Sequence, residues 1–337
     1  MLTSAVVFER PGDVAVRSVE LPDLAPNDVL VRTEWSALSP GTEGRVLDDR
    51  FFSRSFSAQR FPTVPGYQRV GTIEALGGAV RDLRVGQRVF ATRGRVGGGV
   101  AATWGGHIAL ACTPADEVMP LPDGIDGRVA AGLVLAQVGY NGATRPARTG
   151  PGAFVVVVGD GLVGQYAAQV SRARGAHVLL AGRRTDRLDV AARHSATEVL
   201  DVRAEDLAAA VRARRPDGAD VVIDTSSTAD GVRAATALLR RDGELVLLGW
   251  YPEGENLLDV FWFIAGKREL AAHFTGGWTR PRLEATLAAV GAGTLRVAEL
   301  ITHDIPWRDA ADAFALARDR ATEHLGIVID WRGADTQ

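Results

Sequence analysis

Cysteine is nearly absent from this sequence of 337 residues, and positive charge is not in excess. Cys112 is the only cysteine, so neither an internal disulfide nor a cysteine-rich zinc site is expected. The formal net charge is −3 and the isoelectric point is near 6.1. A nucleic-acid-binding surface usually gives a basic chain, so we expect no nucleic-acid partner.

Long hydrophobic segments are missing as well. The apolar run FVVVV at 154–158 is far too short to span a membrane. The opening MLTSAVVFERPGD brings charge and proline too early for the apolar core of a signal peptide. With 46% hydrophobic and 23% charged residues, we expect a soluble cytoplasmic protein. The length favours two domains with room for a cleft.

From residue 1 to about 125, short extended runs alternate with glycine and proline. These runs are SAVVF, DVAVRSVEL, DVLVRTEWSAL, RVGTIEALG, GQRVFAT and HIALACT. Apolar residues alternate or cluster over four to eight positions in them, as in β-strands, and no long helical period interrupts the series. The pattern predicts a β-rich, barrel-like domain.

Near Gly150 the pattern changes to alternating strands and helices. AFVVVVG has the continuous apolar character of a strand that is buried on both faces of a parallel sheet. Helical and extended segments then alternate through GELVLLG, which is typical of a doubly wound α/β domain. A last β-α-β stretch returns to the first domain. We therefore predict one domain from 1–145 with 280–337, and a second from 146–279.

A glycine-rich turn follows the first buried strand of the second domain. It reads Gly159, Asp160, Gly161, Leu162, Val163, Gly164 and opens a predicted helix. In a dinucleotide-binding fold, the three glycines permit the tight turn, the approach of a pyrophosphate and close helix packing. Residues 159, 161, 162, 163 and 164 are the predicted cofactor-binding positions. The alternative is an ordinary glycine-rich turn between a strand and a helix.

The tip of the next strand favours NADP(H) over NAD(H). An NAD-binding domain normally places a carboxylate there, and this chain has Gly182 followed by Arg183 and Arg184. A glycine leaves room for a 2′-phosphate, and a guanidinium binds it with two hydrogen bonds. The alternative is a pair of solvated surface arginines. Gly249 and Trp250 end a later strand at the same edge and are expected beside the cofactor or the substrate.

These pieces, in this order, resemble the medium-chain dehydrogenase/reductase superfamily. Within it, the chain looks most similar to the 3-hydroxyethyl-bacteriochlorophyllide a dehydrogenase branch. The motifs that carry this likeness are WSALSPGTEGRVL, VPGYQRVG, VGQRVF, LLGWYPE, ELITH and the ending IVIDW. The resemblance implies a GroES-like β-rich catalytic domain joined to a Rossmann domain with a doubly wound parallel sheet.

The same resemblance implies that this chain lacks the family's catalytic zinc. In zinc-dependent members VPGYQRVG typically reads Gly-His-Glu, and Tyr67 and Gln68 stand at the His and Glu positions. The first ligand position falls on Ser39 and the third near Val134. Zinc is bound in proteins by Cys, His and carboxylate side chains, which these positions do not supply. We expect no metal.

Without a metal, hydrogen-bond donors must stabilise the substrate oxygen during hydride transfer. The candidates for this catalytic role are Tyr67, Ser39 and Thr42, with Gln68 as a weaker one. The alternative is that Tyr67 and Gln68 only fill the space of the missing metal.

Two further polar residues have open interpretations. Glu43 either orients a hydroxyl or is a solvated loop acid. His107, which follows Gly106, either relays protons or has a structural role, the more common one for an isolated histidine.

The leading hypothesis is a zinc-independent, NADP(H)-dependent oxidoreductase that interconverts an alcohol and a carbonyl on a bulky, partly apolar substrate. An NADPH-dependent enone or quinone reductase and a non-catalytic NADP(H)-binding sensor remain alternatives. The segment ELAAHFTG resembles the sheet-edge element through which this superfamily usually pairs subunits, so we expect a homodimer.

Overall fold

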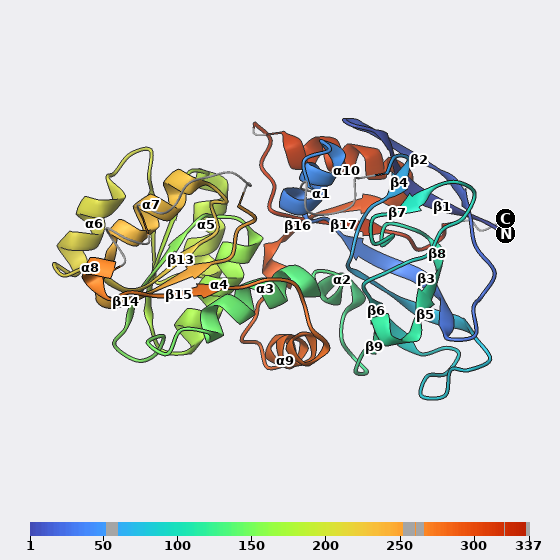
Figure 1. The fold of residues 1–337 in the computed structure, drawn as a ribbon, viewed down its shortest axis with the longest axis horizontal. Coiled ribbons are helices and arrows are strands. Elements are labelled where there is room, and N and C mark those ends of the chain that lie inside the picture. Colours follow the sequence, from blue (N-terminus) through green and yellow to red (C-terminus); the bar gives the residue numbers. More distant parts are fainter. Residues whose placement is uncertain (52–59, 252–259, 261–265, 320, 335–337) are drawn as a thin grey trace. The chain divides into compact units, whose positions relative to one another are not determined.

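The computed structural model describes residues 1–51, 60–251, 260, 266–319 and 321–334. The chain forms two compact units, Met1–Leu133 with Ile301–Gln337, and Val134–Leu300. No helix of the described residues is long and apolar enough to cross a membrane. Figure 1 shows the course of the chain.

The first unit is built mainly from β-strands, as expected from its short extended runs. Its strands are β1 (Leu2–Arg10), β2 (Asp13–Glu20), β3 (Asp28–Ala37), β4 (Thr63–Val64), β5 (Arg69–Leu76), β6 (Arg88–Ala91), β7 (Ala101–Ala102), β8 (Leu110–Pro114), β9 (Val118–Pro120), β16 (Ile301–Pro306) and β17 (Gly326–Asp330). They form a sheet of order β2-β1-β4-β7 and a larger one of order β16-β17-β3-β5-β6-β9, in which β8 also pairs with β3. The late strand β17 pairs with β3 of the same unit.

Short helices complete the first unit. They are α1 (Pro40–Leu47), η1 (Ala115–Glu117), α2 (Gly127–Ala130), η4 (Trp307–Asp309) and α10 (Ala310–Arg318). Helix α1 was not predicted from the sequence. It has Pro40 in its first turn, which suits a helix start, and it buries Val46 and Leu47. These side chains share a core cluster with Phe314 of α10 and Ile327 of β17, which fixes α1 in place.

The second unit has a six-stranded, all-parallel sheet. Its strands are β10 (Phe154–Val158), β11 (His177–Gly182), β12 (Glu198–Asp201), β13 (Ala219–Asp224), β14 (Leu239–Leu247) and β15 (Ala271–Phe274), in the order β12-β11-β10-β13-β14-β15. The neighbouring pairs are all parallel. The chain leaves β10 first toward β11 and later toward β13. Ligands bind at such a switch point, beyond the carboxyl ends of the strands.

The second unit also contains helices, several of which cover its sheet (Figure 1). They are α3 (Leu133–Thr144), α4 (Leu162–Ala173), α5 (Thr185–His194), α6 (Leu207–Arg214), α7 (Ala229–Ala237), α8 (Gly266–Arg268), α9 (Arg280–Gly291) and η3 (Ala298–Leu300). Helices α4 and α5 pack against β10, β11 and β12, whereas α7 packs against β13 and β14. The prediction of a doubly wound α/β domain is confirmed.

The unit boundaries differ from the sequence-based ones. Residues 134–145 and 280–300 lie in the second unit, although the sequence pattern had placed them in the first. Helix α3 packs closely on α4, because an added Cβ at Gly139 would lie 2.6 Å from Tyr166 Cβ. The segment after α9 is tied to α4 by a hydrogen bond of 2.9 Å from Arg296 N to Gln169 Oε1.

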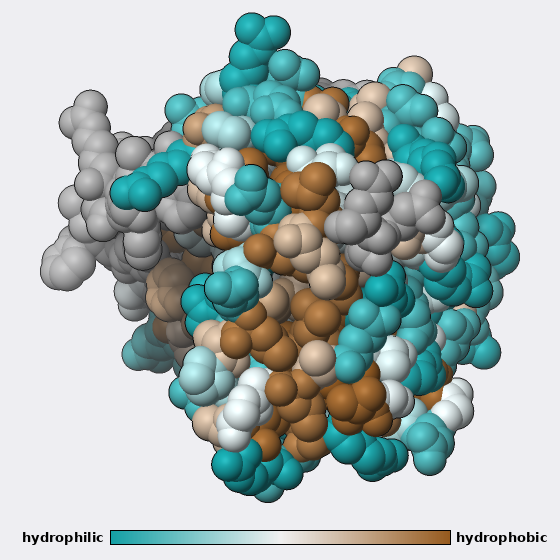
Figure 2. Space-filling view, turned by 90° about the vertical axis from the view of Figure 1, so that its right-hand side faces the viewer, coloured by the Kyte–Doolittle hydropathy of each residue, from teal (hydrophilic) through white to brown (hydrophobic). Residues whose placement is uncertain are grey.

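Figure 2 shows one end of the first unit in space-filling form. A band of hydrophobic residues runs across this face between hydrophilic margins. The surface of the unit is therefore not uniformly polar. Apolar residues on a protein surface are common.

Candidate cofactor and catalytic sites

The glycine-rich turn after β10 has the geometry of a dinucleotide site. Gly159 has φ +118°, and an added Cβ there would lie 2.1 Å from Thr225 Oγ1. An added Cβ at Gly164 would lie 2.1 Å from the carbonyl oxygen of Gly159, so only glycine allows this close packing. Gly161, the N-cap of α4, has open space around its Cβ position. An open approach beside two crowded glycines fits a pyrophosphate.

The first turn of α4 offers backbone donors beside this turn. Leu162 and Val163 are the first two residues of this twelve-residue helix, whose N-cap makes no side-chain hydrogen bond. The first amides of a helix have no partner inside it, and its dipole is positive at this end. The predicted cofactor-binding positions around the turn therefore form a cradle that fits an anionic group.

The tip of β11 holds an arrangement that the sequence pattern did not reveal. Asp160 extends from the glycine-rich turn, and its Oδ2 accepts hydrogen bonds from Arg183 N at 2.7 Å and Arg184 N at 3.0 Å. An added Cβ at Gly182 would lie 2.4 Å from the same oxygen. Gly182 is thus needed to admit Asp160. The inference that this tip lacks a carboxylate was wrong, because the acid comes from the turn and not from the strand.

The two arginines at this tip differ in their surroundings. Arg183 is exposed, whereas Arg184 binds Asp186 through Nε at 3.1 Å and Nη2 at 3.0 Å. The sequence had treated both as equivalent ligands of a phosphate. Arg203, at the end of β12, was missed. It donates to Thr185 Oγ1 at 3.1 Å and so lies beside the same tip.

The ends of β13 and β14 meet at the same edge of the sheet. Trp250 N donates to Ser227 Oγ at 3.0 Å, and an added Cβ at Gly249 would lie 2.6 Å from that oxygen. The Tyr251 hydroxyl donates to Asp224 Oδ2 at 2.6 Å, and burial together with this carboxylate raises the pKa of Tyr251. The predicted positions 249 and 250 therefore share one sheet edge with the glycine-rich turn.

In the first unit, the three predicted catalytic hydroxyls lie together. The Tyr67 hydroxyl donates to Ser39 Oγ at 2.5 Å and also hydrogen-bonds Thr42. Ser39 immediately precedes α1 and Thr42 lies in its first turn, so this unpredicted helix positions both. The Tyr67 ring packs edge-on against Trp104 at 5.1 Å. Burial, reinforced by Glu43, raises the pKa of Tyr67 to about 12, so its hydroxyl stays protonated at neutral pH.

Behind these hydroxyls lies a buried acid–histidine pair. Glu43 Oε2 is 3.0 Å from His107 Nε2, and both side chains are almost fully buried. His107 Nδ1 lies 2.8 Å from Ser36 Oγ, which accepts a hydrogen bond from Trp331 Nε1 at 2.8 Å. Glu43 Oε1 has no hydrogen-bond partner among the described residues. The interpretation of Glu43 as a solvated loop acid was wrong.

The side chains of Tyr67, Gln68 and Arg69 make different contacts. Gln68 Nε2 donates to Ala37 O at 3.2 Å in the protein interior, which fits a structural role. Arg69 is fully buried and donates to Thr33 Oγ1 at 3.0 Å and to Arg93 O at 3.1 Å. Burial lowers the pKa of Arg69 to about 10. Of the three, Tyr67 is the one whose polar group meets the other predicted catalytic hydroxyls.

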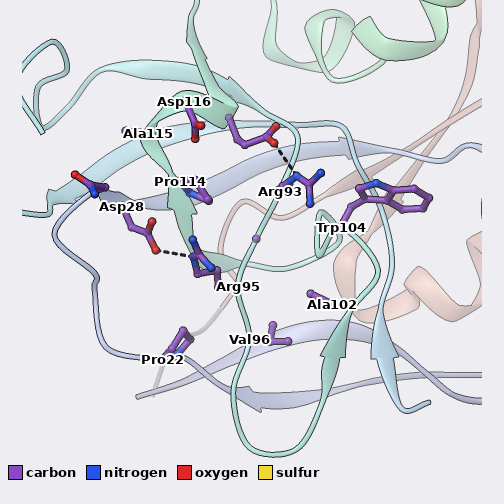
Figure 3. A pocket seen from close by; sticks show the side chains of 13 residues that line it. Pro22, Asp28, Arg93, Arg95, Val96, Ala102, Trp104, Pro114, Ala115 and Asp116 are labelled. Atoms are coloured by element: carbon purple, nitrogen blue, oxygen red, sulfur yellow. Dashed lines mark hydrogen bonds and ion pairs between the residues drawn. The ribbon is translucent and has the colours of Figure 1, made fainter. Parts of the chain in front are cut away.

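A separate open pocket of about 1030 Å³ lies in the first unit (Figure 3). Four of its charged side chains form ion pairs, Arg95 Nε with Asp28 Oδ2 at 2.8 Å and Arg93 Nε with Glu117 Oε1 at 2.7 Å. These pairs neutralise the charges that an ionic ligand would need. Trp104 lines the pocket as well.

The donor set does not fit a catalytic zinc. Across the described ranges, with gaps at 52–59, 252–259, 261–265, 320 and 335–337, no three His, Cys, Asp or Glu side chains are grouped to hold a metal. The hydroxyls of Ser39 and Tyr67 are not typical zinc ligands in proteins.

Comparisons with known proteins agree with this architecture. Residues 25–123 match the alcohol dehydrogenase GroES-like domain, and residues 163–290 match the zinc-binding dehydrogenase family. The 2-desacetyl-2-hydroxyethyl bacteriochlorophyllide A dehydrogenase of Cereibacter sphaeroides is 26% identical, over 98% of this chain and 99% of that protein. An L-threonine 3-dehydrogenase of Rhizobium etli is 27% identical over the same shares of the two chains.

A solved structure shows the same fold over the whole length. The putative zinc-binding dehydrogenase of Sinorhizobium meliloti 1021, bound to NADP, has a TM-score of 0.86 and 24% identity. The alignment covers 98% of this chain and 99% of that one. With its GroES-like unit, its Rossmann unit and relatives along its whole length, this chain belongs to the medium-chain dehydrogenase/reductase superfamily of oxidoreductases.

Proposed function

We propose that this protein is a zinc-independent, NADP(H)-dependent oxidoreductase that interconverts an alcohol and a carbonyl on a bulky, partly apolar substrate. The observation that carries the proposal is the hydrogen-bonded cluster of Tyr67, Ser39 and Thr42. The family resemblance assigns two of these positions, Ser39 and Tyr67, to metal ligands. Three hydroxyls that packed side chains hold in place can stabilise a charged substrate oxygen by hydrogen bonding.

When bound, NADPH would supply a hydride to a carbonyl, and NADP⁺ would accept one from an alcohol. The chain's own residues must stabilise the oxygen of the substrate in either direction. Because the pKa of Tyr67 is raised to about 12, Tyr67 acts as a hydrogen-bond donor and not as a base. It donates to Ser39 Oγ, and a hydroxyl that accepts one hydrogen bond still carries its own proton. Tyr67 therefore polarises the Ser39 hydroxyl, and Ser39 donates its own hydrogen bond to the substrate oxygen.

The preference for NADP(H) rests on the tip of β11. The exposed guanidinium of Arg183 is suited to a 2′-phosphate, and Arg203 lies beside the same tip. The NADP-bound relative from Sinorhizobium meliloti supports this choice of cofactor. The bacteriochlorophyllide dehydrogenase relative supports a large, partly apolar substrate.

Reduction of an activated carbon–carbon double bond is the second candidate. The absence of typical zinc ligands among Ser39, Tyr67 and Val134 favours it equally, because quinone and enone reductases in this superfamily also work without zinc. Incubation with NADPH and a panel of ketones, enones and quinones, followed by product analysis, tests the proposal. An alcohol product supports it. A saturated ketone or a hydroquinone supports the second candidate, and cofactor binding without turnover supports a sensor.

We predict that the purified protein contains no stoichiometric zinc. Hydroxyl and aliphatic side chains at the expected ligand positions do not bind it. Elemental analysis of extensively desalted protein should find far less than one zinc per chain. About one tightly bound zinc per chain, as in a typical four-ligand site, would refute this.

We also predict a homodimer that pairs through the edge strand β15. This strand ends the parallel sheet, and its Phe274 is 68% exposed. An exposed apolar sheet edge is normally covered in a stable protein. Light scattering at micromolar concentration should give twice the chain mass.

Phe274→Lys should produce monomers, because it places a charge in this contact. Val85→Lys, at another exposed apolar residue (59%), serves as the control and should leave the dimer intact. A monomeric mass for the unaltered protein would contradict the prediction.

A further inference from the structure

Asp160 places a carboxylate at the adenosine end of the dinucleotide site. In the commonest arrangement the last residue of the second strand supplies this acid. Here the strand ends in Gly182, and Asp160 Oδ2 takes the space where a side chain at 182 would begin, 2.4 Å from the position of an added Cβ. The carboxylate therefore occupies the tip although the strand does not encode it.

The contacts of Asp160 hold this carboxylate in one orientation. Its Oδ2 accepts both amides of the tip, from Arg183 at 2.7 Å and Arg184 at 3.0 Å. Its Oδ1 lies 3.7 Å from Arg187 Nη1. A carboxylate oxygen can accept two hydrogen bonds, so Oδ1 retains capacity for a hydroxyl donor such as a ribose 2′-OH.

The charges around the tip are nearly balanced. Arg184 is paired with Asp186 and Arg203 with Asp201, and Asp160 faces Arg187. Arg183 and Arg203 are both exposed at this tip, and Arg203 is already paired with Asp201. A 2′-phosphate brings a charge of about −1.5 to −2 into this region. The carboxylate of Asp160 repels that phosphate, while the Arg183 guanidinium attracts it.

We propose that Asp160 is the ribose-reading acid of this site and that it limits the preference for the 2′-phosphorylated cofactor. This inference rests on the proposed function, because it assumes that the glycine-rich turn binds a dinucleotide. It predicts a site that binds both forms of the cofactor, with NADPH favoured by Arg183 and NADH supported by Asp160. Neutralising Asp160 should widen the gap in favour of NADPH.

The test uses two adenosine fragments that lack the nicotinamide, 2′,5′-ADP and 5′-AMP, titrated by calorimetry into the full-length protein. Asp160→Asn keeps an oxygen that can accept the two amides and removes the charge. We expect it to raise the ratio of 2′,5′-ADP affinity to 5′-AMP affinity by about tenfold or more. Asp160→Ala should shift the ratio in the same direction. The affinity for NADPH should change as that for 2′,5′-ADP does, and the affinity for NADH as that for 5′-AMP does.

A control and a second measurement keep the result interpretable. Asp230→Asn makes the same charge change at an exposed acid of α7 and should leave the ratio unchanged. Thermal unfolding of each variant shows whether the protein stays folded, and only folded variants are compared.

The inference is overturned if the ratio stays constant or falls in both Asp160 variants, which would leave Asp160 as a positioning residue for the tip. Wild-type protein that binds neither fragment would reject the dinucleotide site, and the inference with it. Wild-type binding together with an unaffected Arg183→Ala variant would reject only the role proposed for the arginine.

Discussion

Replacing Tyr67 with phenylalanine is expected to lower kcat by up to about 10²–10³-fold, the cost of removing a donor that touches a developing oxyanion, because Ser39 then loses the donor that polarises its hydroxyl. The ring remains, with its edge-on contact to Trp104, so packing is preserved. The melting temperature should therefore change little. Cofactor affinity should also change little, because the predicted cofactor residues lie in the second unit. Steady-state kinetics with a saturating carbonyl substrate and NADPH measures the effect.

Three further variants separate catalysis from packing. Tyr67→Ala should lower stability as well as activity, because it leaves a cavity in the interior. Tyr166→Phe removes a hydroxyl from another fully buried tyrosine, in α4, and should keep full activity. Ser39→Ala should resemble Tyr67→Phe in kcat if the two hydroxyls act in series. Full activity of the Tyr67→Phe variant would show that Tyr67 only fills the space of the missing metal.

Replacing Arg183 with alanine should weaken NADPH binding by about 1.5–3 kcal/mol, the range for a hydrogen bond to a charged group. NADH binding should be nearly unchanged, because NADH has no 2′-phosphate. Arg184→Ala should have a smaller effect, since its guanidinium already binds Asp186. The double variant should show at least the loss of the Arg183 change alone. Fluorescence titration of the unaltered protein, the two single variants and the double variant gives the dissociation constants for both cofactors.

The matched control is Arg215→Ala. Arg215 donates to Gly152 O, next to the amino end of β10, so the charge is lost from the opposite edge of the sheet. It should leave the affinity for both cofactors unchanged. Equal weakening of NADPH and NADH by Arg183→Ala would mean that this arginine does not recognise the 2′-phosphate.

The sequence predicted those parts of the fold that local patterns encode. The continuous apolar run of β10 and the turn from Gly159 to Gly164 identify a Rossmann unit, because strand, turn and helix signals are adjacent in the chain. The alternating runs of the first unit predicted its main strands. Helix α1 escaped notice because it has only eight residues, two of them glycines, and depends on core contacts for its stability.

The details of both sites depend on contacts between distant residues, which local patterns do not contain. Asp160 meets the amide of Arg183 across 23 positions, and Glu43 meets His107 across 64. The sequence placed Tyr67, Ser39 and Thr42 in one group only through a family resemblance. It gave no sign that Glu43 is buried or that Asp160 reaches the strand tip.

One measurement tests the central claim, that hydrogen-bond donors replace a metal in an NADP(H)-dependent reduction. Protein treated with a chelator and desalted is mixed with NADPH and a panel of bulky ketones, and NADPH oxidation is followed at 340 nm, its usual absorbance wavelength. The account predicts turnover of at least one ketone to its alcohol, at a rate that added zinc does not change. Ketone reduction that appears only after zinc is added would contradict it.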